Sequence, residues 1–115
     1  MKHIKIANIT YAFHIEDNLT TPEGEAAYGN IKHSDQTLLL SSDFPSKQKR
    51  DEVLLHEIIH GVIHLYGVDS MIDPKNEESI VTILARGMMQ VFQDNPDLVK
   101  ELFNGNTTRS IRIRK

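Results

Sequence analysis

Cysteine and tryptophan are both absent from this chain of 115 residues. Without cysteine the protein can form no disulfide and can offer no thiolate to a metal ion. Any metal site must therefore use histidine and carboxylate ligands, which the 6 histidines and 16 acidic residues can supply. The absence of cysteine also fits the reducing environment of the cytoplasm.

The sequence also lacks a long apolar run. Residues 1–6 alternate between polar and apolar side chains, whereas a signal peptide has an apolar stretch of about 7–15 residues. No run elsewhere approaches the roughly 18 apolar residues that cross a bilayer. We therefore expect a cytoplasmic protein that does not bind membranes.

Positive charge is scarce, because 13 basic residues face 16 acidic ones and the formal net charge is −3. Domains that bind nucleic acid through bulk charge are usually basic, so a nucleic-acid partner is not favoured. The length supports one hydrophobic core and not two. We predict a single domain over residues 1–103 and a polar, basic tail over residues 104–115, where several arginines gather.

The first forty residues have the pattern of strands. Apolar residues alternate with polar or small ones, with a break near Asn8, which is the period of a half-buried strand. A turn is expected at residues 33–35. The pattern predicts a small, mostly antiparallel sheet made of hairpins. The strand pattern covers residues 4–15 with that break, a second strand is expected over 26–31, and a third over 36–40.

The pattern changes to that of helices from Ser46. Residues 47–66 contain no proline, and Gly67 follows where a C-terminal cap belongs. A second helix is expected to begin at Asp73-Pro74 and to end near Asn95-Pro96, with further helical turns over 97–103. The fold class is therefore α+β, with two packed helices beside the sheet. The predicted apolar stripe of the first helix is Leu54, Ile58, Val62 and Leu65.

The first helix carries the motif His56-Glu57-Ile58-Ile59-His60. Residues four apart lie one turn apart on the same face, so the two imidazoles can meet one tetrahedral ion. Glu57 lies off that stripe, where it can act as a general base toward water at the ion. This is the HExxH arrangement of zinc peptidases.

Two histidines do not complete a catalytic zinc site, which has three protein ligands and an open fourth position. The second helix begins with Asn76-Glu77-Glu78, and a carboxylate there would give two histidines and one glutamate. Helix geometry does not decide between Glu77 and Glu78. Glu77 shares a stripe with Val81 and Leu84, whereas Glu78 shares one with Val81 and Ala85.

Three segments together resemble a family of small phage and prophage proteins, the predicted zinc peptidases of the ImmA/IrrE and minigluzincin type. They are Val53–His60, Glu77–Ala85 and the stretch from Gln90 to Pro96. The resemblance implies a minimal zincin-like fold, one zinc ion per chain, a peptide or protein substrate and a bacterial host. In that family the third ligand lies seven residues before an alanine, which here indicates Glu78.

A second resemblance begins at His60-Gly-Val-Ile-His64 and runs to Ser70. It is similar to the signature of YbeY-type metal-dependent endoribonucleases, which bind zinc with three histidines, but the third position here is Ser70. His56, His60 and His64 cannot easily share one ion, because positions eight apart lie about 12 Å apart along a helix. A zinc module that binds a partner protein without catalysis is a third hypothesis.

A peptidase also needs a second donor for the developing oxyanion, besides the metal. Candidates are Tyr28, Tyr66 and His64, and the sequence does not choose among them. An extended peptide would pair with an exposed sheet edge beside the cleft. The strand at residues 36–40 is a candidate for that edge, and the alternative is an ordinary internal strand.

Overall fold

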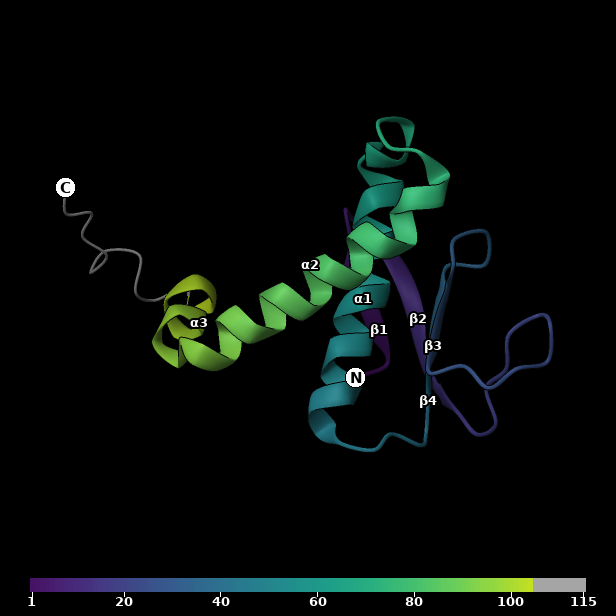
Figure 1. The fold of residues 1–115 in the computed structure, drawn as a ribbon, viewed down its shortest axis with the longest axis horizontal. Coiled ribbons are helices and arrows are strands. Elements are labelled where there is room, and N and C mark those ends of the chain that lie inside the picture. The colour runs from purple at the N-terminus through teal and green to yellow at the C-terminus, as the bar shows by residue number, and fades with distance from the viewer. Residues whose placement is uncertain (105–115) are drawn as a thin grey trace.

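The computed structural model describes residues 1–104, and these form an α+β fold (Figure 1). A four-stranded sheet is followed along the chain by three helices and one short 3-10 turn. The predicted α+β class is confirmed. The elements are β1 (His3–Ile6), β2 (Ile9–Glu16), β3 (Gly29–Lys32), β4 (Thr37–Ser41), α1 (Lys47–Leu65), η1 (Val68–Ser70), α2 (Pro74–Asp94) and α3 (Pro96–Phe103).

The sheet has the strand order β1-β2-β4-β3. The pairs β1–β2 and β3–β4 are antiparallel hairpins, as predicted, and β2 pairs with β4 in parallel. The loop after β2 makes this possible, because it is long enough to return the chain before the second hairpin begins. The prediction that residues 36–40 form the sheet edge is wrong: β4 is an internal strand, and the two edge strands are β1 and β3.

The turn between β1 and β2 explains the break in the sequence pattern near Asn8. Ile6 pairs with Ile9, so the loop contains only Ala7 and Asn8. Both have positive φ angles, 50° and 67°. Two-residue hairpin loops favour this left-handed geometry, because its twist matches that of the strands.

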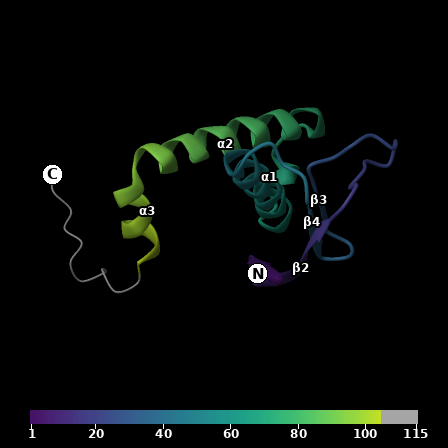
Figure 2. The same ribbon diagram turned by 90° about the horizontal axis from the view of Figure 1, so that it is seen from below.

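α1 lies between the sheet and α2, so the fold has three layers (Figure 2). The side chain of Ser46 accepts a hydrogen bond from Lys49 N at the start of α1. Gly67, with φ of 76°, follows the helix as predicted. Leu54 and Ile58 pack against the sheet, in the cluster built on Phe13, Leu38 and Leu40.

The predicted apolar stripe of α1 is wrong at Val62, whose exposed fraction is 38%. Ile59 and Ile63 are buried instead, in a second cluster with Val81 and Ala85 of α2. The prediction of one apolar stripe is wrong because α1 is covered on two sides, by the sheet and by α2.

α2 begins and ends where the sequence predicted. The side chain of Asp73 accepts a hydrogen bond from Lys75 N, and Pro74 occupies the first turn. The first half of α2 crosses α1, while the second half and α3 extend away from the sheet (Figure 1). Among the described helices, none is long and apolar enough to span a membrane. The predicted tail lies outside the described residues, apart from Asn104.

Candidate metal centre

His56 and His60 lie one turn apart on α1, on the face between the sheet and α2. Their ring centroids are 4.9 Å apart, and the side chains are 18% and 15% exposed. The HExxH spacing therefore brings the two rings together in the folded chain, as the helical period requires.

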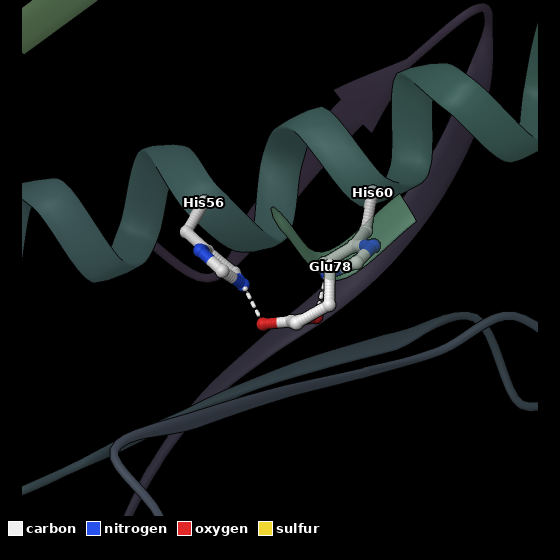
Figure 3. A group of neighbouring side chains, drawn as sticks. All are labelled: His56, His60 and Glu78. Atoms are coloured by element: carbon white, nitrogen blue, oxygen red, sulfur yellow. Dashed lines mark hydrogen bonds and ion pairs between the residues drawn. The ribbon is translucent and has the colours of Figure 1, made fainter. Parts of the chain in front are cut away.

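The carboxylate of Glu78 reaches both histidines from α2 (Figure 3). Its Oε1 lies 2.8 Å from Nε2 of His56, and its Oε2 lies 2.8 Å from Nε2 of His60. Ligand atoms of all three residues lie within 4.8 Å of one another. Two imidazole nitrogens and one carboxylate are a donor set that zinc binds. The three residues thus form a group that can hold a metal ion.

Glu77 lies behind this group. Its Oε2 lies 2.7 Å from Nδ1 of His60, on the side of the ring opposite the Nε2 that faces Glu78. A carboxylate at this position holds the proton on Nδ1 and leaves Nε2 free for an ion, as outer partners of metal-bound histidines commonly do. The two acidic residues therefore have different positions, with Glu78 in the group and Glu77 supporting it.

Contacts, and not burial, distinguish the two glutamates of α2. Val81 and Ala85 are 0% and 1% exposed and pack on α1, but Val81 shares a stripe with both glutamates. The side chain of Glu78 is 69% exposed and that of Glu77 is 27% exposed, so burial alone does not choose Glu78. Glu78 contacts both His56 and His60, whereas Glu77 contacts His60.

Glu57 is buried beside the two histidines, with 8% of its surface exposed. Burial raises the pKa of its carboxyl group to about 7, while the nearby His60 acts in the opposite direction. Glu57 lines one open cleft together with His33, His56, His60 and Glu78. A carboxyl group with a pKa near neutrality is suited to accept and return a proton.

β3 approaches α1 closely at Glu57, and Gly29 makes this approach possible. A Cβ atom at Gly29 would lie 2.9 Å from Cγ1 of Val53 and 3.2 Å from Cγ of Glu57. We expect Gly29→Ala to lower the free energy of unfolding by about 1–3 kcal/mol, the usual cost of overpacking. Urea denaturation of the variant measures the change. An unchanged denaturation midpoint would show that the contact is not tight.

The raised pKa of Glu57 predicts a pH-dependent stability of the protein after metal removal. A carboxyl group whose pKa is higher in the folded state stabilises the fold least when it is ionised, so its contribution is lost as pH rises from about 4.5 to about 7. Glu57→Gln removes this ionisation. The free energy of unfolding of the metal-free variant should exceed that of the metal-free wild type by roughly 1–3 kcal/mol at pH 8. At pH 4.5 the two free energies should differ little. Urea denaturation at both pH values tests this, and an equal difference at both would contradict it.

His64 does not join the group of His56, His60 and Glu78. Its ring stacks on that of His33, with centroids 4.0 Å apart, and its Nδ1 lies 3.4 Å from Oδ2 of Asp69. Of the tyrosines considered for the oxyanion, Tyr28 stacks on Phe44, and Tyr66 is 65% exposed.

Sequence reasoning missed His33 as a residue of the site. Residues 33–35 were predicted only as a turn, and His33 is indeed the first residue of the loop between β3 and β4. The only signal in the sequence was a histidine at the end of a strand. Its position beside the cleft depends on the pairing of β3 at the sheet edge next to α1.

Comparison of this chain with protein-family models, curated proteins and solved structures gives no match.

Proposed function

We propose that this protein is a zinc-dependent metallopeptidase, with one ion held by His56, His60 and Glu78 and with Glu57 as the general base. The observation that carries the proposal is the convergence of the Nε2 atoms of both histidines on the carboxylate of Glu78. The buried Glu57 in the same cleft adds the group that hydrolysis needs. The resemblance of the HExxH helix to small phage zinc peptidases is in line with this function.

A zinc ion bound by these residues would act as a Lewis acid for a peptide carbonyl and would acidify water. Glu57 would take the proton from the attacking water and deliver it to the leaving amine. Its burial in the cleft keeps it beside the two histidines, where it would reach water at the ion. Glu77 would keep the ring of His60 oriented through Nδ1.

The free edge of β3 supports a peptide as the substrate. Ser41 N donates a hydrogen bond to Tyr28 O, so Tyr28 is paired with β4 through its backbone. Hydrogen-bonded and non-hydrogen-bonded residues alternate along an antiparallel strand. The backbone N–H and C=O groups of Gly29 and Ile31 therefore point away from β4. Both residues line the cleft that holds the metal-binding group. An extended peptide could therefore pair with β3 and pass beside Glu57.

The endoribonuclease alternative requires His64 as a ligand. His64 instead contacts His33 and Asp69, and Glu78 is the third member of the group. A zinc module without catalysis is the third hypothesis, and it differs from the peptidase in having no need of a buried Glu57.

Metal content tests the ligand set directly. We expect about one zinc per purified chain by mass spectrometry, and a loss of affinity of more than about 100-fold in His56→Ala and in Glu78→Gln, since loss of a ligand exceeds the effect of an outer partner. His64→Ala is the matched control and should keep the ion. Circular dichroism checks that each variant is folded.

The opposite pattern would reject this site. Zinc retained in Glu78→Gln and lost in His64→Ala would favour the three-histidine alternative and make RNA the substrate to test. Full occupancy with no hydrolysis of any peptide would favour the module without catalysis.

A further inference from the structure

His33 lies in the cleft without a role in the proposed metal site. It is half-buried and lines the cleft with His56, Glu57, His60 and Glu78. Its ring is fixed on two sides. His64 stacks on one face at 4.0 Å with an interplanar angle of 12°, and the hydroxyl of Tyr11 lies 3.1 Å from Nδ1.

The Tyr11 hydroxyl determines which nitrogen of His33 carries the proton. Tyr11 is 1% exposed, and burial raises the pKa of its phenol, so the hydroxyl keeps its proton. Among residues 1–104, the only hydrogen-bond partner of this hydroxyl is Nδ1 of His33. A buried O–H group requires an acceptor, so Tyr11 donates and Nδ1 accepts. A neutral His33 therefore carries its proton on Nε2.

A neutral ring is also the state that this environment favours. Burial and the neighbouring His64 lower the pKa of His33. Nε2 takes part in no hydrogen bond within the described residues. The ring thus presents a fixed N–H donor on the side opposite to Tyr11.

We propose that His33 is a catalytic hydrogen-bond donor, whose Nε2–H donates to the peptide carbonyl oxygen as that oxygen becomes negatively charged. Tyr11 is a positioning residue that fixes the tautomer, and His64 supports the ring by stacking. This inference rests on the proposed peptidase function and adds the second donor that oxyanion stabilisation requires.

An oxyanion mimic tests the donor without a substrate. Methylphosphonate is titrated into the cobalt-loaded protein, with binding followed by the visible spectrum of the ion, and ethanethiol is titrated separately as a ligand that presents no oxyanion. His33→Phe keeps a flat ring against His64 and removes the donor. It should bind methylphosphonate about 10- to 100-fold more weakly, the range for a hydrogen bond to a charged group, and ethanethiol as tightly as the wild type.

The variants separate this inference from the proposed metal site. His14→Phe, the same change at an exposed histidine of β2 outside the cleft, should bind both ligands like the wild type. Tyr11→Phe should weaken the binding of methylphosphonate alone, by less than His33→Phe does. Two results would overturn the role of His33 while leaving the metal site intact. In the first, His33→Phe binds methylphosphonate as tightly as the wild type does. In the second, His33→Phe binds methylphosphonate and ethanethiol more weakly by the same factor. A wild type that binds no cobalt would overturn both proposals.

The tautomer has its own measurement, which needs no metal. Long-range ¹H–¹⁵N correlation spectra of the metal-free protein should show Nε2 of His33 protonated and Nδ1 unprotonated at pH 8. Tyr11→Phe should shift this preference toward a mixture, because the acceptor role of Nδ1 is lost. An Nδ1–H tautomer in the wild type would overturn the assignment.

Discussion

Glu57→Gln should abolish most peptide hydrolysis while leaving the metal content and the fold unchanged. The amide cannot accept a proton from water, and general acid–base catalysis contributes roughly 10²–10⁴-fold to rates. Glu57 makes none of the contacts that join His56, His60 and Glu78, so its loss should spare the ion. The measurement is cleavage of a mixture of unstructured peptides by the zinc-loaded variant, read by mass spectrometry.

A distant carboxylate provides the control for this experiment. Glu101 lies exposed on α3, away from the cleft, and Glu101→Gln makes the same chemical change. That variant should cleave peptides like the wild type. If Glu57→Gln cleaves as fast as Glu101→Gln, the general base is another group or the observed hydrolysis comes from a contaminating peptidase.

Glu77→Gln should weaken zinc binding about 10- to 100-fold without abolishing it. The carboxylate lies 2.7 Å from Nδ1 of His60, where it orients the ring and makes the opposite nitrogen a better donor to an ion. An amide can still accept from Nδ1–H, but without charge. Competition with a chromophoric chelator gives the dissociation constant.

The loss of zinc affinity in Glu77→Gln is to be compared with the loss in Glu78→Gln, because the two residues are neighbours in sequence. If Glu78 is a ligand and Glu77 an outer partner, the loss in Glu78→Gln must be the larger. A larger loss in Glu77→Gln would exchange the two roles and place the ion on the other side of His60.

Local sequence signals predicted the secondary structure well, because caps and turns depend on near neighbours. Ser46, Asp73 and Gly67 mark helix ends as expected, and Asn8 marks a hairpin turn. The HExxH spacing placed His56 and His60 on one face for the same reason. Each of these features follows from contacts within a few residues along the chain.

Features that depend on distant contacts were not predictable from one sequence. The parallel pairing of β2 with β4 leaves β3 at one edge of the sheet, and no local pattern specifies this pairing. His33 enters the cleft only because of that order. Glu78, and not Glu77, contacts both histidines because of the way α2 crosses α1, and residue periodicity alone allowed both.

The two helices that would supply the metal ligands share one apolar cluster. Ile59 and Ile63 of α1 meet Val81 and Ala85 of α2, and the ligands bridge the same pair of helices through Glu78. A bound ion would therefore act as a cross-link that closes the loop between His60 and Glu78, with part of its binding energy spent on docking α2. In the metal-free protein, the backbone amides of the first half of α2 should exchange with solvent faster than those of α1, and loading the ion should slow them.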